Sequence, residues 1–286
     1  DAVHSYLSDA QAELLLRRSL ARSPDNPKPA IMLVQLGYRT NRLTLMEEAT
    51  ALALNAIAEL DNERLSDQAQ DQLTTVLLEI AAGHALNTGE TAPPKPEMLA
   101  NLKVARATAF RLLSTVIRSA SQRVAFALAY GDWLKLDDPA AAVNSYASIL
   151  RDPDLRRQWV WEGDVGRRGG TWATTLLNNL IVSGGPDIRS ILQERADQDP
   201  AADVSNLTSM KPTSLINLAR AFPFSHQGVQ ASMQAAQLLI EQGAPRRAIG
   251  LLMLIGRSAK PADQTLIAAQ ALKLTQDMGW TDLATM

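Results

Sequence analysis

Apolar residues recur along most of the chain at steps of three and four positions, the spacing that puts side chains on one stripe of an α-helix. Three stripes show this pattern: one is Ala69, Leu73, Val76, Leu77, Ile80 and His84, the second is Met98, Leu102, Ala105, Ala109, Leu112, Val116 and Ala120, and the third is Ile267, Ala271, Leu274 and Met278. The alternation typical of strands is nearly absent, and 158–162 (QWVWE) is the only short candidate. The pattern predicts an all-α fold.

Short segments rich in proline, glycine and aspartate interrupt the helical pattern, as at 136–139 (LDDP), 242–245 (QGAP) and 259–263 (AKPAD). Asp or Ser accepts hydrogen bonds from the free N–H groups of a new helix, Pro fits its first turn, and Gly suits the end of the previous helix. We therefore expect about thirteen helices with short connections. The longest polar segment is 87–97, which predicts an N-terminal array over 1–90 and a C-terminal array over 97–286.

Three stretches, 30–57, 124–153 and 231–255, share one helix-turn-helix pattern. Each has a small residue in its first helix and, eleven or twelve positions later, an alanine that opens its second helix; the pairs are Gly37 and Ala49, Gly131 and Ala142, and Ala236 and Ala248. Small residues at these positions let two antiparallel helices approach closely, and the larger Leu36, Tyr146 and Leu252 are expected to fill the layer between hairpins. A single hairpin cannot bury its apolar face alone, so the pattern predicts hairpins that stack on one another.

This pattern resembles the tetratricopeptide repeat family. The resemblance implies a right-handed α-α superhelix that binds a protein or peptide partner through the surface lined by the first helices. Carried over to this chain, it implies partner contacts by Tyr38, Asn41, Arg42, Gln237 and Glu241.

The segment 218–252, with FPFS at 222–225, is similar to helical-repeat segments of bacterial cell-envelope proteins. Some of these proteins also carry a β-propeller of PQQ-like repeats. The resemblance implies a scaffolding role, a periplasmic or cell-envelope setting, and a β-propeller domain in the same full-length chain.

The segment 159–172 (WVWEGDVGRRGGTW) combines three tryptophans, four glycines and two arginines. A nucleotide P-loop needs a Lys before its Ser or Thr, but Gly170 precedes Thr171 directly. We interpret the segment as an irregular turn between helices, with Thr171 as the N-cap of the next helix and the tryptophans packed on neighbouring hairpins. The alternative is an exposed patch that meets a partner, since Trp and Arg are enriched at binding hot spots. Its residues are Trp159, Trp161, Arg167, Arg168 and Trp172.

The composition of the chain argues against several classes of function. The 286 residues carry a formal net charge of −2, which argues against sequence-independent electrostatic binding of nucleic acid. Cysteine is absent and the three histidines, His4, His84 and His226, have no metal-binding spacing, so we expect no metal or cofactor. No apolar run approaches the roughly 20 residues of a membrane-spanning helix.

The sequence therefore predicts a non-catalytic interaction or scaffold module that binds a protein or peptide, and not an enzyme. Two alternatives stay open. An all-α enzyme would need two converging acids in a deep cleft, and a ligand-binding domain would need a closed pocket between helices near 159–172.

Overall fold

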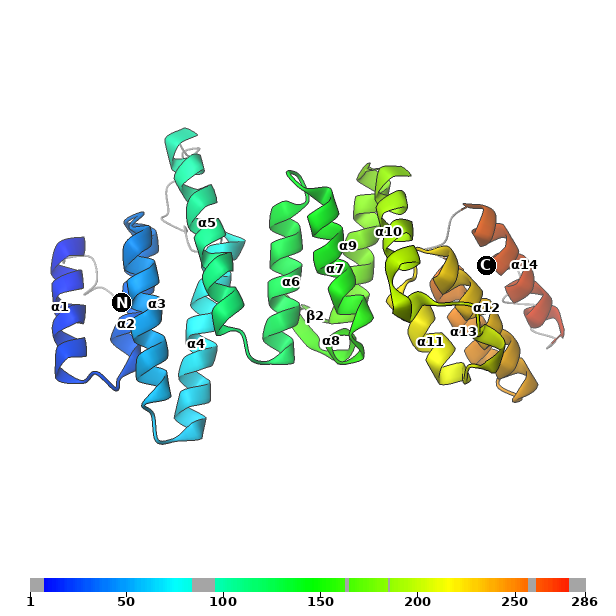
Figure 1. Ribbon diagram of the computed structural model, residues 1–286, viewed down its shortest axis with the longest axis horizontal. Coiled ribbons are helices and arrows are strands. Elements are labelled where there is room, and N and C mark those ends of the chain that lie inside the picture. Colours follow the sequence, from blue (N-terminus) through cyan, green and yellow to red (C-terminus); the bar gives the residue numbers. More distant parts are fainter. Residues whose placement is uncertain (1–7, 84–95, 163–164, 185, 257–260, 278–286) are drawn as a thin grey trace. The chain divides into compact units, whose positions relative to one another are not determined.

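The computed structural model describes residues 8–83, 96–162, 165–184, 186–256 and 261–277 (Figure 1). These residues contain fourteen α-helices, two short 3-10 helices and two four-residue strands, which confirms the all-α prediction. The chain divides into two compact units, Asp1–Tyr130 and Gly131–Met286. The boundary expected at 87–97 lies mostly outside the described residues, and it stays a prediction, as does the right-handed superhelix.

Prolines explain where most helices begin, because the ring fixes φ near its helical value and the first turn needs no N–H donor. Eight α-helices start at a proline: α2 (Pro27–Arg39), α5 (Pro96–Val116), α7 (Pro139–Arg151), α8 (Pro153–Arg157), α10 (Pro186–Gln198), α11 (Pro212–Ala221), α13 (Pro245–Gly256) and α14 (Pro261–Asp277). The others are α1 (Asp9–Arg22), α3 (Leu43–Ala58), α4 (Glu63–Ala82), α6 (Ala120–Leu134), α9 (Gly169–Gly184) and α12 (His226–Glu241). The 3-10 helices are η3 (Pro200–Ala202) and η4 (Leu207–Ser209).

Polar side chains cap these starts as the sequence predicts. Asp138 accepts a hydrogen bond from the Ala141 N–H at 2.9 Å, and Asp152 accepts one from the Asp154 N–H at 2.8 Å. Each bond satisfies a backbone donor that has no partner inside the first turn of its helix. The turns between helices are therefore encoded locally.

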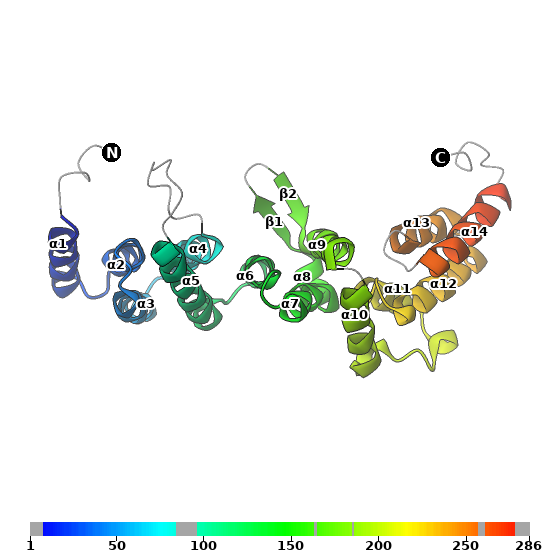
Figure 2. The same cartoon turned by 90° about the horizontal axis from the view of Figure 1, so that it is seen from above.

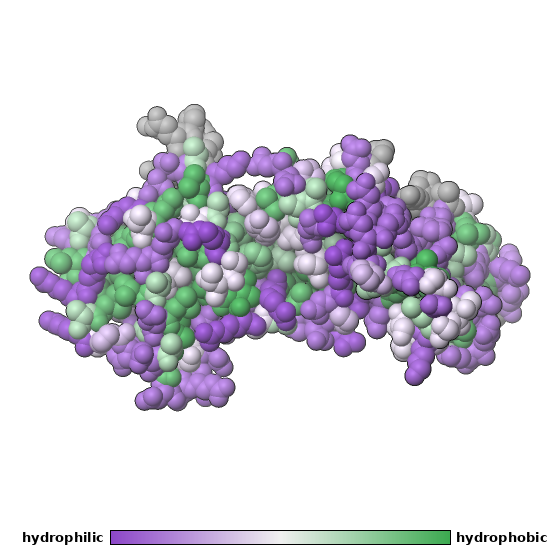
Figure 3. Space-filling model, viewed as in Figure 1, coloured by the Kyte–Doolittle hydropathy of each residue, from purple (hydrophilic) through white to green (hydrophobic). Residues whose placement is uncertain are grey.

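The first unit contains α1 to α5 and most of α6. α2 packs against α3 and α4 packs against α5, so each pair forms a hairpin. α2 also contacts α4, and α3 contacts α5, so like helices of successive hairpins are neighbours. On the face shown in Figure 3, polar side chains break up the apolar surface over α1 to α5.

Most described positions of the predicted apolar stripes are buried, while Leu102, Ala120 and Ala271 are half-buried. In α4 the buried positions are Ala69, Leu73, Val76, Leu77 and Ile80, and in α5 they include Ala105, Ala109, Leu112 and Val116. The stripe predicted through Ala120 is divided, because α5 ends at Val116 and Ala120 opens α6. His84 and Met278 lie outside the described residues.

The small residues predicted to let helices approach do so within each hairpin. A Cβ on Gly37 in α2 would lie 2.9 Å from Met46 Cγ in α3. A Cβ on Gly131 in α6 would lie 2.4 Å from the Tyr146 ring in α7. Neither distance leaves room for a methyl group, so glycine is required at both positions.

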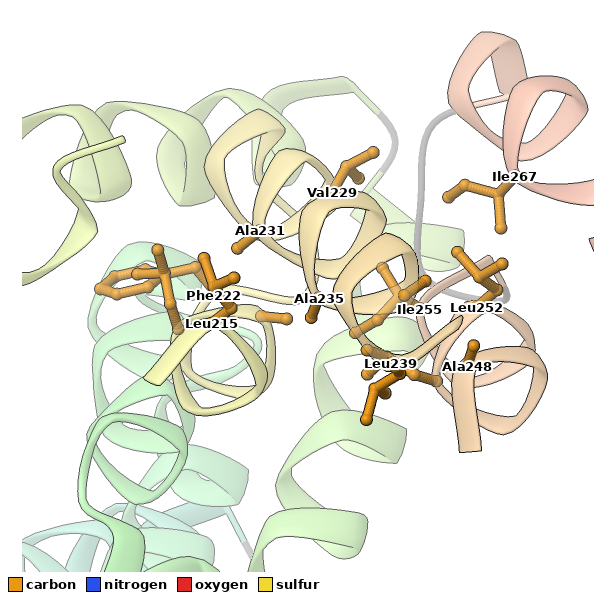
Figure 4. Close-up of a cluster of buried hydrophobic side chains, with 14 of the residues drawn as sticks. Leu215, Phe222, Val229, Ala231, Ala235, Leu239, Ala248, Leu252, Ile255 and Ile267 are labelled. Atoms are coloured by element: carbon orange, nitrogen blue, oxygen red, sulfur yellow. The ribbon is translucent and has the colours of Figure 1, made fainter. Parts of the chain in front are cut away.

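The second unit contains α7 to α14 and the end of α6. α11 packs against α12, α12 against α13, and α13 against α14. Their apolar faces form one cluster, in which Leu215, Ala235, Ala248 and Leu252 are completely buried (Figure 4). Apolar burial on this scale is the main stabilising contribution to the unit, at about 25 cal/mol per Å².

The segment 159–172 is partly a β-hairpin rather than an irregular turn. β1 (Trp159–Glu162) pairs antiparallel with β2 (Val165–Arg168), which confirms the strand candidate at 158–162, and the hairpin projects beside α8 and α9 (Figure 2). α9 begins directly at Gly169, where the Gly169 N–H donates to the Gln158 carbonyl at 2.7 Å. Thr171 therefore lies inside the first turn, and its prediction as an N-cap is wrong.

Candidate functional site

A groove follows α2 and α4 in the first unit. Two adjoining cavities of about 440 and 890 Å³ form it and share Met32, Gln35, Val76 and Glu79. Its lining runs along α4 from Arg64 to Ile80, which at 1.5 Å per residue is about 24 Å. The residues alongside it on α2 run from Lys28 to Arg39, so the two helices point the same way.

The groove has an apolar floor and a polar rim. Ile31, Val76 and Ile80 are buried along its length. The exposed side chains that line it carry both signs of charge; they include Lys28, Arg64, Asp67, Asp71 and Glu79. In protein interfaces in general, an apolar base contributes affinity and charged side chains at the edge contribute orientation.

Sequence reasoning missed most of this groove. The available signal was the α4 stripe, which identified Val76 and Ile80 as apolar positions. It did not show that α2 and α4 would lie side by side, because that contact depends on how the two hairpins pack.

Tyr38 does line one end of the groove, together with Gln35 and Arg39. Its ring is buried, with 5% of the residue exposed. Burial raises the pKa of Tyr38, because the charged phenolate is disfavoured away from water. The side chain therefore faces the groove as a neutral, largely apolar surface.

Asn41 and Arg42 lie in the connection between α2 and α3 rather than on the groove. Asn41 adopts the left-handed conformation, with φ of 54°, which turns the chain between the helices. Arg42 donates to Glu13 on α1, with which it forms an ion pair. The carboxylate that Arg42 binds thus belongs to its own chain.

The Arg42 ion pair is part of a larger charge cluster. Arg17 donates to Glu13 at 3.0 Å and holds Glu48 through two hydrogen bonds of 2.7 and 2.9 Å. Hydrogen bonds from Arg42 and Arg17 lower the pKa of Glu13, and a hydrogen bond from Arg17 lowers the pKa of Glu48. This cluster attaches α1 to the α2–α3 hairpin.

Gln237 and Glu241 are exposed one turn apart on α12, where the Gln237 amide donates to the Glu241 carboxylate at 3.3 Å. They lie in the second unit, whereas Tyr38, Asn41 and Arg42 lie in the first.

The β-hairpin presents aromatic side chains to solvent. Trp159 is 53% exposed and Trp161 is 68% exposed, so the prediction that they pack on neighbouring helices is wrong. Their rings stack with centroids 6.5 Å apart. Large exposed aromatic side chains that lie together are typical of interaction surfaces.

An arginine lies over an indole ring on each face of the hairpin. Side chains alternate along a strand, so Trp159 and Trp161 share one face with their cross-strand partners Arg168 and Gly166. The Arg168 guanidinium lies 5.5 Å from the Trp159 ring centroid. On the opposite face, the Arg167 guanidinium lies 5.5 Å from the ring of Trp172, which is half-buried on α9. The structure thus brings together the five predicted patch residues.

The cavities and the metal-ligating side chains also bear on the alternatives of an enzyme or a ligand-binding domain. The groove cavities and the small cavity beside Phe222 contain no residue of 159–172. In the described ranges, no group of three His, Cys, Asp or Glu side chains is placed to hold a metal ion. Among the described helices, none has the length and apolar character needed to cross a bilayer.

Neither a scan against protein-family models nor a search of curated proteins gives a match to this chain.

Proposed function

We propose that this protein is a non-catalytic interaction module that holds a segment of a partner protein in the α2–α4 groove. The observation that carries the proposal is the groove itself, which combines a buried apolar floor with an exposed rim of both charges over about 24 Å. That length suits an extended segment of about seven residues or a helix of about sixteen.

The arrangement of helices supports this proposal. α2 and α4 open successive hairpins and lie in contact, which is the surface on which a tetratricopeptide-like array receives its partner. The tetratricopeptide-like superhelix, the bacterial cell-envelope setting and the accompanying β-propeller belong to the same proposal. They rest on the sequence resemblance.

Site-specific photo-crosslinking in cells that produce the protein tests the groove. A photoreactive amino acid replaces Gln35 or Gln72, both exposed on the groove, and Ala51 on α3 serves as the exposed control position. We expect the groove positions to crosslink to a discrete protein and Ala51 not to do so. Equal crosslinking at all three positions, or none in the groove, would contradict the proposal.

A further inference from the structure

The outer edge of β2 is available for pairing. Within the described residues the sheet contains only β1 and β2, so the other edge of each strand has no neighbouring strand. Hydrogen-bonded pairs alternate in an antiparallel ladder, and the Gly169–Gln158 bond fixes the phase. The N–H and C=O groups of Gly166 and the N–H group of Arg168 therefore point away from β1, where an added strand can bond them, while the Arg168 carbonyl accepts the first hydrogen bond of α9.

Positive charge lines this edge on both faces of the sheet. Arg167 and Arg168 are consecutive, so their side chains leave β2 on opposite faces. Both are exposed, and no carboxylate among the described side chains forms an ion pair with either; each guanidinium contacts an indole ring instead. In the sequence the acids Glu162 and Asp164 precede the two arginines, so the positive charge lies at the end of β2 that adjoins α9.

An apolar surface adjoins the arginines on the same edge. A Cβ on Gly166 would lie 2.9 Å from the Trp161 six-membered ring, so the indole crosses from β1 and covers Gly166. Beside it, Val165 is 51% exposed. From Arg168 back to Val165, the edge therefore offers two positive positions followed by two apolar ones.

We propose that β2 accepts an extended acidic segment of a partner protein as a third, antiparallel strand. Charge complementarity places acidic residues opposite Arg168 and Arg167, and apolar residues opposite Gly166 and Val165. Since the added strand runs opposite to β2, the segment reads acidic, acidic, apolar, apolar from its N-terminus. This surface lies in the second unit and is independent of the proposed groove.

The backbone geometry favours a polypeptide over other anionic partners. The outward N–H and C=O groups of β2 are matched only by a chain with peptide groups at strand spacing. Nucleic acids and lipid headgroups provide phosphates for the arginines but no such ladder. They are therefore alternatives that an experiment must separate.

Binding of a fluorescently labelled peptide, Thr-Asp-Glu-Val-Val-Thr, to the intact chain tests the proposal by fluorescence anisotropy. We expect weak, saturable binding that disappears when Lys-Lys replaces Asp-Glu. Arg168→Glu and Arg167→Glu should each weaken binding about tenfold, since each removes an attraction and adds a repulsion. Arg123→Glu changes an exposed arginine on α6 and should leave binding unchanged.

Trp161→Ala tests the apolar half of the edge. Loss of the indole should weaken binding of the Asp-Glu-Val-Val peptide several-fold. Circular dichroism of each variant checks that the helical fold is retained, because the exposed hairpin contributes little to the buried core.

N-methylated peptides distinguish strand addition from simple charge attraction. Methylation of the first Val nitrogen removes the donor that faces the Gly166 carbonyl and should abolish binding. Methylation of the Glu nitrogen, which faces away from β2, should preserve it. Equal effects at the two positions would overturn the proposal.

Two further results would also overturn it. One is absence of binding by the unmodified peptide at millimolar concentration. The other is stronger binding of single-stranded oligonucleotides or of phosphatidylserine vesicles, with the same loss in Arg167→Glu and Arg168→Glu, which would assign the arginines to phosphate recognition.

Discussion

α1 in the first unit and α12 in the second are of similar length but are held by different forces. α1 has 14 residues, none of them fully buried. α12 has 16 residues, of which seven are buried: Gly228, Val229, Ala231, Ser232, Ala235, Ala236 and Leu239. α12 is part of an apolar core, whereas α1 lies on the surface of its unit.

Ion pairs attach α1 to the rest of its unit. Its ion pairs join Asp9 to Arg39, Glu13 to Arg42 and Arg17 to Glu48. Exposed pairs of this kind contribute about 0–1 kcal/mol each, while full burial of one leucine side chain contributes about 1.5–3 kcal/mol. We therefore expect α12 to unfold only with its unit and α1 to detach under mild conditions.

Ala248→Arg should have the largest effect, because it attacks the apolar side of this comparison. Ala248 is 0% exposed in α13, where it packs in the cluster that contains α12. A buried unpaired guanidinium should lower the free energy of unfolding by about 3–5 kcal/mol, measured by urea denaturation. Gln237→Arg, at an exposed position of α12, is the control. Equal stability of the two variants would show that the assigned packing is wrong.

Gly228→Ala should have the next largest effect. A Cβ on Gly228 would lie 2.0 Å from the Phe222 carbonyl oxygen, and backbone cannot yield as a flexible side chain does. We expect a loss of about 1–3 kcal/mol in the free energy of unfolding. Gly250→Ala, on the exposed side of α13 with no atom within 4 Å, is the matched control. It should stabilise by about 1 kcal/mol, because alanine is the better helix former.

Glu13→Gln should have a smaller and local effect on α1. The amide removes the charge that pairs with Arg42 and Arg17, at a cost of about 0.5–1 kcal/mol. Hydrogen exchange followed by mass spectrometry should show faster exchange in α1 and unchanged exchange in α3. Asp67→Asn, at an exposed position of α4, should leave α1 unchanged. Protection of α1 equal to wild type would mean that apolar contacts attach it after all.

Acid should loosen α1 in the same way. The pKa values of Glu13 and Glu48 are lowered by their arginine partners, so the folded state favours the ionised form. Their contribution is complete above the unfolded pKa of about 4.3 and is lost as the pH falls through the lower folded pKa values. Exchange in α1 should therefore be constant from pH 7 to about pH 5, apart from the intrinsic rate, and rise below about pH 4. Protection of the α12 amides against exchange should persist at low pH. Equal loss of protection in α1 and α12 would show that the two helices are not held by different forces.

The helices could be predicted because their signals are local. Pro139 and Asp138 lie next to each other in sequence and start α7 together. The spacing of Gly37 and Ala49 likewise predicts a helical hairpin from positions that are close in the sequence. Such features need only the neighbouring residues and the 3.6-residue period.

The hairpin and the groove could not be predicted in the same way. The sequence indicated β1 as a short strand candidate, but not β2 or the pairing of the two strands, because Val165–Arg168 shows no alternation and the glycines between Trp161 and Thr171 favoured a turn. The two residues of the Arg42–Glu13 ion pair are 29 positions apart in the sequence, so no local sequence pattern predicts the pair. The groove depends on contacts between hairpins, which the periodicity of one helix does not specify.

The attachment of α1 has a consequence for proteolytic processing. A cut within 23–26 would release a helix that buries no side chain completely, so the remaining hairpins would keep their folded core. It would also free the guanidiniums of Arg39 and Arg42 from their acidic partners, close to where Tyr38 ends the groove. Under the proposed function, the trimmed protein should prefer acidic segments more strongly than the intact one, and its groove would lack the wall formed by Ala12 and Leu16 of α1.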